Sequence, residues 1–200
     1  MFNPPVMDTW NRETESGQGT GDVTWRQRIS PLSKAPQQPG IALLGVCCDE
    51  GVKRSGGRTG AAEGPDNLRP ALARLAYHLD RPLYDAGNVI CEEDKLDLLT
   101  LEQSNMIFKL LNKGHFPLVL GGGQEIAYGS YWGLYLHLTP FGGNADIGII
   151  NIDAHFDLSQ ADEPGSDTPF LQIAKSCRNS GSSFHYFCLG INENSNTRAL

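Results

Sequence analysis

Long apolar runs are missing from this sequence, and no stretch approaches the roughly 20 consecutive apolar residues of a membrane-spanning helix. The N-terminus lacks the basic-then-apolar pattern of a secretory signal, so the expected location is cytoplasmic. Positive charge is also scarce, since 16 lysines and arginines stand against 23 aspartates and glutamates. The net charge of −7 argues against nucleic acid or an anionic membrane surface as the partner.

Cysteine pairing motifs are absent as well. The five cysteines are an odd number, and no two of them form a C-x-x-C pair. Three of them lie in apolar, strand-like runs. We therefore expect small buried thiols in a reducing compartment.

The composition is that of one soluble globular domain, because 40% of the 200 residues are hydrophobic and 20% are charged. Residues 1–40 are rich in Pro, Gly, Gln and polar residues. They predict a mostly irregular N-terminal segment with one short helix near TWRQRI. An ordered domain is expected over residues 41–200, beginning with the apolar run IALLGVCC.

From residue 41 onward, patterns of buried strands alternate with helical ones. We expect strands at 41–48, 83–89, 117–121, 147–152 and 185–190, and helices at 65–79, 95–113, 125–138 and 168–178. The strands are near-continuous apolar runs, which is typical of parallel strands buried on both faces. The sequence therefore predicts an α/β fold in three layers, α/β/α, with a mainly parallel sheet and function at the carboxyl ends of its strands.

The strongest chemical signal is NIDAHFD at residues 151–157, at the end of an expected strand. Asp153, His155 and Asp157 alternate, so an extended backbone would place their side chains on one face. Two carboxylates and an imidazole suit a borderline-hard divalent cation such as Mn²⁺ better than the thiolate-rich sites of zinc. The motif predicts a metal site, and the alternative is a polar loop with a hydrogen-bonded histidine.

Several stretches, in the same order along the chain, resemble the arginase-type ureohydrolases and within them the formimidoylglutamases. They are CDEGVKRSGGRTGAAEGPDNLR, LYDAGNV, LVLGGGQEIAYGSYWGL, NIDAHFDL, DTPFLQI and CLGINENSNTRAL. The resemblance covers residues 41–200 and the N-terminal two-thirds of such enzymes. It implies an arginase-like fold, homo-oligomers, and hydrolysis of N-formimidoyl-L-glutamate to L-glutamate and formamide by a hydroxide between two Mn²⁺ ions.

The resemblance also implies a ligand set drawn from three motifs. DAHFD supplies Asp153, His155 and Asp157, whereas the histidine that follows the family's glycines is Gln124 here. An amide oxygen is a weaker ligand than imidazole, so we expect one or no Mn²⁺ to bind. The family's later DxD motif is absent from this sequence. Two interpretations stand: a Mn²⁺-dependent amidine hydrolase, or a non-catalytic relic with an impaired metal site.

The glycines before Gln124 allow a third interpretation, a phosphate-binding loop at a strand–helix junction. No Gly-Lys-Ser/Thr sequence follows them, which makes this the weaker alternative. Glu125 begins the next expected helix, where the helix dipole favours a negative charge. A role behind the metal ligands is the alternative for this carboxylate.

Arg58 lies in the glycine-rich loop 51–64, which the resemblance places beside the substrate. Its planar guanidinium can bind a carboxylate at two points, and a glutamate-like substrate carries two carboxylates. A solvated surface arginine is the alternative. Lys53 and Arg54 of the same loop are expected to be solvated.

By resemblance the complete sheet has the strand order 2-1-3-8-7-4-5-6, and the sequence ends after the fifth strand. The strands present would form two groups, 2-1-3 and 4-5, with the centre of the sheet missing between them. The third and fourth strands must then pair directly or leave backbone groups unpaired, at about 1–3 kcal/mol for each buried group. We therefore expect the chain alone to be marginally stable.

Overall fold

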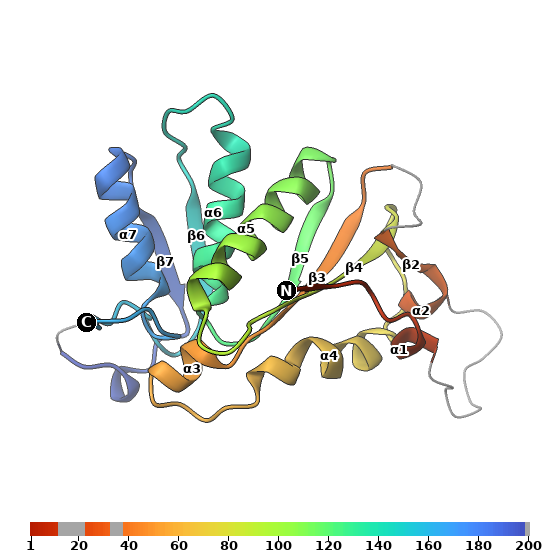
Figure 1. Cartoon of the computed structure of the whole chain (residues 1–200), viewed down its shortest axis with the longest axis horizontal. Coiled ribbons are helices and arrows are strands. Elements are labelled where there is room, and N and C mark those ends of the chain that lie inside the picture. Colours follow the sequence, from red (N-terminus) through yellow and green to blue (C-terminus); the bar gives the residue numbers. More distant parts are fainter. Residues whose placement is uncertain (12–22, 33–37, 199–200) are drawn as a thin grey trace.

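The computed structural model describes residues 1–11, 23–32 and 38–198, and its order of strands and helices is shown in Figure 1. The strands are β1 (Phe2–Asn3), β2 (Ile29–Pro31), β3 (Ile41–Cys47), β4 (Leu83–Ile90), β5 (Phe116–Leu120), β6 (Gly148–Ile152) and β7 (His185–Leu189). The α-helices are α1 (Asp8–Asn11), α2 (Trp25–Arg28), α3 (Glu50–Arg54), α4 (Gly64–Leu72), α5 (Leu96–Asn112), α6 (Ile126–Leu138) and α7 (Pro169–Ser180). Short 3-10 helices lie at Ala61–Glu63 and Glu193–Ser195.

The first sheet has β3 between β4 and β5, and both pairings are parallel. Ile41 of β3 lies opposite Leu83 of β4 on one side and Phe116 of β5 on the other. On the outer side of β4, β2 pairs in parallel and β1 pairs antiparallel. The predicted mainly parallel sheet is confirmed.

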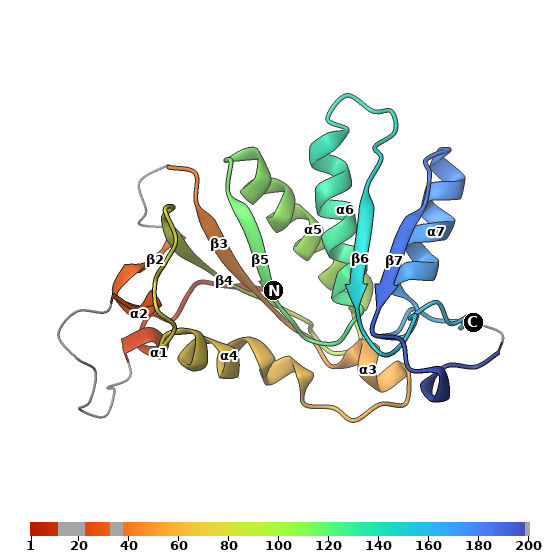
Figure 2. The same cartoon turned by 180° about the vertical axis from the view of Figure 1, so that it is seen from behind.

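Helices cover both faces of this sheet, because successive residues of β3 point in opposite directions. Ala42 and Leu44 share a buried cluster with side chains of α5. Leu43 shares another with Trp10 of α1 and with residues beside α4. Figures 1 and 2 show α5 on one side of the strands and α4 on the other. The predicted three layers are present here.

The second sheet contains β6 and β7, which pair in parallel from Gly148 opposite His185 to Ile152 opposite Leu189. Helices α6 and α7 cover one face of it, through a cluster that includes Tyr131 and Phe170. Among the described residues β5 and β6 are not paired, so the strands fall into two sheets. The expected separation of the first three core strands from the last two is confirmed.

Helices α5 and α6 pack against each other and join the two sheets. Two glycines allow the close approach: a Cβ at Gly133 would lie 2.6 Å from the Cβ of Ile107, and one at Gly129 would lie 2.5 Å from Gln103 Oε1. The buried Gln103 amide donates to the carbonyl of Ile126 at 2.7 Å and to Ser130 Oγ at 2.9 Å. The contact between α5 and α6 therefore combines close helix packing with buried hydrogen bonds.

The N-terminal segment is more ordered than predicted. The helix near TWRQRI is confirmed as α2 (Trp25–Arg28). The segment also contains β1, α1 and β2, and β1 and β2 pair with β4. Residues 12–22 and 33–37 of this segment lie outside the described residues. The division of the chain at residue 40 stays a prediction.

Helix α4 ends at Leu72, whereas the sequence predicts a helix to residue 79. Beyond it the chain pairs with the N-terminal segment: Tyr77 N donates to the carbonyl of Val23 at 2.7 Å, and Trp25 N donates to that of Leu75 at 3.0 Å. Pro70 has no N–H for the helical ladder. Hydrogen bonds to a distant segment therefore replace the last turns of the predicted helix.

All five cysteines are free thiols, as expected. Cys48 and Cys177 are buried, whereas Cys47, Cys91 and Cys188 are only partly buried. Burial raises the pKa of the Cys47 thiol to about 11. This thiol is therefore neutral at physiological pH.

Asp85 of β4 is a fully buried carboxylate that ties the N-terminal segment and α4 to the first sheet. It accepts hydrogen bonds from the Trp10 indole at 2.7 Å and from the Arg69 guanidinium at 2.8 and 3.0 Å. The backbone N–H of Gly87 also donates to it, at 2.9 Å. A buried charge is tolerated here because each of its oxygens is paired.

We expect Asp85→Ala to lower the free energy of unfolding by about 3–5 kcal/mol, because Arg69 would remain buried without its main partner. Urea unfolding followed by tryptophan fluorescence measures the change. The matched control is Asp66→Ala, since Asp66 is the other carboxylate on Arg69 but its side chain is 70% exposed. The control should change stability by less than about 0.5 kcal/mol. Equal losses in the two variants would contradict this account.

Candidate functional site

The loops that follow β3, β5 and β6 meet at one edge of the molecule, the carboxyl ends of the parallel strands. The carbonyl of Gly51, in α3 after β3, accepts from the N–H of Ser166 at 3.0 Å. The turn after β5 contacts β6 through Gln124 and Asn151. Parallel α/β proteins place their ligands at this edge, so the candidate site lies where the sequence predicts function.

The glycines after β5 are needed for close approach. A Cβ at Gly122 would lie 2.8 Å from the carbonyl oxygen of Cys48, so a side chain there would strike the backbone at the end of β3. A Cβ at Gly123 would lie 2.1 Å from Glu125 Oε2. The turn therefore packs tightly behind the site and brings Gln124 to the edge of β6.

A chain of hydrogen bonds links Gln124 to the DAHFD loop. Gln124 Nε2 donates to Asn151 Oδ1 at 3.2 Å, and Asn151 Nδ2 donates to the Tyr186 hydroxyl at 3.1 Å. That hydroxyl donates to the carbonyl of Phe156 at 2.8 Å. Asn151 is buried, so these bonds are shielded from water. Neither Asn151 nor Tyr186 was predicted from the sequence as a site residue, although both lie on the more buried face of their strands.

The DAHFD loop places Asp153 and His155 in contact. Asp153 Oδ1 accepts from the backbone N–H of His155 at 2.9 Å and lies 3.2 Å from His155 Nδ1. The extended backbone assumed from the alternating spacing does not continue to Asp157, whose φ is +50°. The backbone therefore departs from an extended strand at the last acidic residue of the motif.

The surroundings of Asp157 disfavour the ionised form of its carboxyl group. Burial, and then the negative charge of Asp153, raise the pKa of its carboxyl to about 6, while His155 acts in the opposite direction. A carboxylate beside another carboxylate is stabilised by a bound cation. The chemistry of Asp153, His155 and Asp157 thus suits a divalent ion such as Mn²⁺.

The structure brings the predicted ligands together only in part. Among residues 1–11, 23–32 and 38–198, no three or more His, Cys, Asp or Glu side chains are placed to hold an ion together. The assignment of Asp153, His155, Asp157 and Gln124 as ligands therefore stays a prediction. What the structure brings together is Gln124 with Asn151, and Asp153 with His155.

The asparagines after β7 hold the DAHFD loop from its other side. Asn196 donates to the carbonyl of Ala154 at 2.8 Å and accepts from the N–H of Phe156 at 3.2 Å. Asn192 caps the 3-10 helix by accepting from Asn194 N. The loop is therefore fixed by side chains from two neighbouring segments.

Arg58 lies in an exposed part of the loop between α3 and α4, and no hydrogen bond or ion pair joins it to another described residue. Its role toward a substrate stays a prediction. The expectation that Arg54 is solvated is wrong. Arg54 pairs with Glu50 at 2.9 Å and donates to the carbonyls of Asp94 and Pro164 at 2.7 and 3.3 Å. The spacing of Glu50 and Arg54, four residues apart on a helix, was the available signal.

Glu125 is the residue before α6, which begins one position later than predicted, and its carboxylate is buried. Gly51 packs against it so closely that a Cβ there would lie 2.5 Å from Glu125 Cδ. Burial raises the pKa of this carboxyl, which opposes the favourable effect of the helix dipole.

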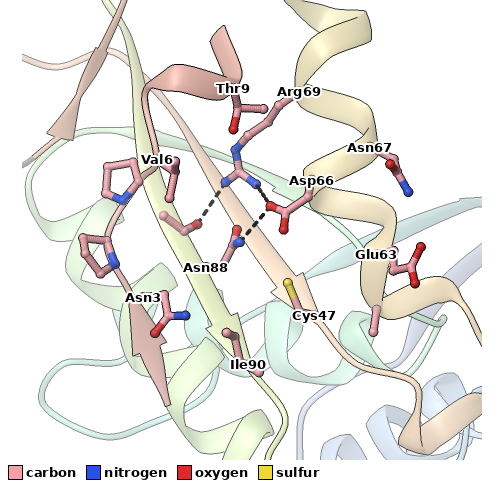
Figure 3. Close-up of a pocket in the computed structure, with 14 residues that line it drawn as sticks. Asn3, Val6, Thr9, Cys47, Glu63, Asp66, Asn67, Arg69, Asn88 and Ile90 are labelled. Atoms are coloured by element: carbon pink, nitrogen blue, oxygen red, sulfur yellow. Dashed lines mark hydrogen bonds and ion pairs between the residues drawn. The ribbon is translucent and has the colours of Figure 1, made fainter. Parts of the chain in front are cut away.

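A cavity of about 560 Å³ lies elsewhere, between the N-terminal segment, α4 and the ends of β3 and β4 (Figure 3). Asn3, Asp66 and Asn88 line it, and Asn88 Nδ2 donates to Asp66 at 3.1 Å. Arg69 reaches it as well, but all five guanidinium N–H groups already donate to Asp85, Asp66, Pro65 and Gly87. No sequence-predicted site residue lines this cavity.

A second cavity, of about 380 Å³, lies beside the candidate site. It is an open groove along β6, between that strand and α6, and Gln124 and Asn151 stand at one end of it. The other lining residues are mostly apolar, including Tyr131, Leu134 and Ile147.

Comparison with known proteins supports one family. A sequence profile described as the Arginase family matches residues 39–199. A formimidoylglutamase of Aeromonas hydrophila is 46% identical over the full chain. A crystal structure of a Trypanosoma cruzi formiminoglutamase variant with Mn²⁺ superposes with a TM-score of 0.73 at 27% identity, over 88% of this chain and 59% of that one. A Bacillus subtilis formimidoylglutamase gives 0.71 at 22% identity, over 96% and 61%, which supports the fold alone.

The chain matches only part of these proteins. It spans 63% of the length of the Aeromonas hydrophila relative and corresponds to the N-terminal portion of such enzymes. The arginase-like fold predicted from the sequence is confirmed. Within the described residues, no helix has the length and apolar character required to cross a membrane.

We expect Tyr186→Phe to loosen the DAHFD loop, because the hydroxyl that joins Asn151 to Phe156 is removed while the ring still packs against Phe170. The free energy of unfolding should fall by about 1 kcal/mol, and amides of residues 153–157 should exchange faster with deuterium. Tyr135→Phe is the control, since its hydroxyl binds the carbonyl of Gly143 away from the site. Unchanged exchange in the Tyr186 variant would contradict the positioning role.

We expect Asp157→Asn to stabilise the metal-free chain above pH 6. The raised pKa, about 6 against an ordinary 3.8, means that ionised Asp157 costs stability as pH rises through this window. At pH 8 the gain should be about 1 kcal/mol after screening by solvent, and it should vanish below about pH 4. Urea unfolding in a chelator measures it. The control is Asp146→Asn at an exposed position, and a less stable Asp157 variant at pH 8 would overturn the prediction.

Proposed function

The chain belongs to the arginase family, and from this we propose that it forms part of a formimidoylglutamase-type hydrolase. The reaction consumes water and N-formimidoyl-L-glutamate, breaks the bond between the amidine carbon and the glutamate nitrogen, and yields L-glutamate and formamide. The observation that carries the proposal is the DAHFD loop at the carboxyl end of β6, beside the turn that presents Gln124. We also propose a cytoplasmic location and self-association.

A metal ion is part of this proposal. Asp153, His155 and Asp157 would hold Mn²⁺, whose positive charge supplies activation of water and stabilisation of negative charge on the substrate. The raised pKa of the Asp157 carboxyl supports this proposal, because a bound cation would stabilise its ionised form. One ion rather than two is proposed for this chain, because Gln124 stands where the family's histidine is expected.

The chain's own side chains fix the parts of the site. Tyr186 and Asn196 hold the backbone of the DAHFD loop at Phe156 and Ala154. The amide N–H of Gln124 is engaged by Asn151, which leaves its oxygen as the atom able to bind a cation. Arg58, exposed on its loop, would bind a carboxylate of the substrate at two points. This division of roles separates recognition of the glutamate end from chemistry at the amidine.

A specific observation favours a second candidate function. The described residues hold no assembled group of three metal-binding side chains, and Gln124 is a poor ligand. The chain on its own would then be a non-catalytic relic that keeps the fold. The two candidates differ in metal affinity, since only the first requires the DAHFD loop to bind Mn²⁺.

Calorimetric titration of the full chain with Mn²⁺ tests the proposal. We expect one ion to bind at about micromolar affinity, and Gln124→His to bind about tenfold more tightly, which corresponds to about 1.4 kcal/mol. An assay for formamide released from N-formimidoyl-L-glutamate follows for both proteins. Higher formamide release in the variant would support the hydrolase.

The control is Gln38→His, which introduces the same imidazole at an exposed position before β3, away from the strand ends that carry the site. It should leave Mn²⁺ affinity unchanged. Absence of Mn²⁺ binding in both the parent chain and Gln124→His would contradict the metal proposal and favour the non-catalytic relic.

A further inference from the structure

The cavity of about 560 Å³ beside α4 is separate from the candidate site (Figure 3). The N-terminal segment, the start of α4 and the carboxyl ends of β3 and β4 enclose it. Parallel α/β proteins bind ligands at this edge of the sheet. Its volume lies within the roughly 300–1,000 Å³ of small-molecule sites and far exceeds what a single metal ion fills. The cavity therefore fits an organic molecule.

The lining of this cavity favours a positively charged ligand. Glu63 and Asp66 contribute carboxylates, and among the described residues that line the cavity only Arg69 is cationic. The Arg69 guanidinium is buried and all of its N–H groups already donate, chiefly to the buried Asp85. An anion would therefore meet two carboxylates and no free cationic donor, whereas a cation would be attracted.

Asp66 is the carboxylate best placed to bind a cation. Figure 3 shows its side chain directed from α4 toward Asn88 of β4. Its Oδ1 accepts from Asn88 Nδ2 at 3.1 Å and from Arg69 Nη1 at 3.3 Å, which fixes the carboxylate. No described residue donates to its Oδ2, so this oxygen is available to a ligand. Burial, and then the charge of Asp66, raise the pKa of the Cys47 thiol to about 11, so Cys47 lines the cavity as a neutral group.

The opposite wall of the cavity is apolar. Pro4, Pro5 and Val6 of the N-terminal segment line it, and Figure 3 shows Val6 across the cavity from Asp66. This wall is held at both ends, since β1 pairs with β4 before it and α1 packs on the first sheet after it. Apolar carbons of a ligand would be removed from water against this wall. The cavity therefore has one charged side and one apolar side.

We propose that this cavity binds a small organic cation, with its ammonium group at Asp66 and its apolar body against Pro4, Pro5 and Val6. The exposed Glu63 adds negative charge that favours the same ligand. A free amino acid fits poorly, because its carboxylate would meet these two carboxylates with no free cation to bind it. The site therefore selects amines that lack a carboxylate. It is distinct from recognition of a glutamate-like substrate and does not rest on the proposed function.

Three probes with similar carbon skeletons test the proposal on the full chain. Phenethylammonium is the cation, 2-phenylethanol is the neutral analogue and phenylacetate is the anion. Titration is followed by the backbone amide signals in two-dimensional NMR spectra. We expect phenethylammonium to shift the amides of residues 3–9, 61–69 and 87–90, with a Kd of about 1 mM. The alcohol should bind about tenfold more weakly, and phenylacetate should not bind.

Asp66→Asn removes the charge and keeps an oxygen that can accept from Asn88 and Arg69, so the fold is retained. It should weaken phenethylammonium about fivefold, the size expected for an ion pair near the surface. Asp80→Asn is the matched control, because it removes the same charge at an exposed position beyond the amino end of β4. The control should leave the affinity unchanged. The dispersion of the amide signals shows directly that each variant is folded.

Binding of phenethylammonium at these amides, with weakening by Asp66→Asn alone, supports the proposal. Equal affinity for the alcohol overturns it, since the cavity would then select apolar carbon without charge. Equal weakening by Asp66→Asn and Asp80→Asn, shifts confined to other amides, or no binding to the parent chain also overturn it. The three probes are compared on the parent chain, so the proposal stays falsifiable without any variant. Metal binding and formamide release enter none of these outcomes.

Discussion

The contact between α5 and α6 is the constraint on which the rest of the structure depends. The two sheets share no strand pairing in the described part of the chain, and the packing of α5 against α6 is the main contact that holds them together. Gly129 and Gly133 bring the helices close, and Gln103 uses its buried amide to bind the backbone and a side chain of α6. Strand pairing would ordinarily fix such a distance, and here helix packing does so.

The candidate site depends on the same helix contact, because its residues follow strands of both sheets. Gln124 follows β5, whereas Asn151 and Asp153 belong to β6 and its loop. A second tie lies at the loops, where Arg54 donates to the carbonyl of Pro164 and Ser55 Oγ donates to Asp167 at 2.5 Å. A shift of α6 on α5 would therefore move the second sheet, which packs on α6, relative to the first sheet.

Local patterns predicted the strands and most helices, because near-continuous apolar runs and helical spacing are properties of short stretches. The separation into two sheets followed from the resemblance to the arginase-type ureohydrolases, which supplied the strand order. Contacts between distant segments could not be predicted from local patterns. Trp10 is buried against Asp85, and residues 75–77 pair with the N-terminal segment instead of continuing the helix. Within the site, spacing pointed to Asp153 and His155 but could not show the turn at Asp157 or the hydrogen bonds through Tyr186.

The unpaired edges of β5 and β6 and the candidate site lie at the same place in the described part of the chain. A parallel strand placed between β5 and β6 would end at the edge where Gln124 and Asp153 lie, because β5 and β6 both finish there. Side chains at its carboxyl end would then lie beside Gln124, a neutral amide, and near Asp157, whose carboxyl has a raised pKa. The same strand would bury the apolar groove beside α6. A strand at this position would therefore bury apolar surface and bring side chains to the candidate site at the same time.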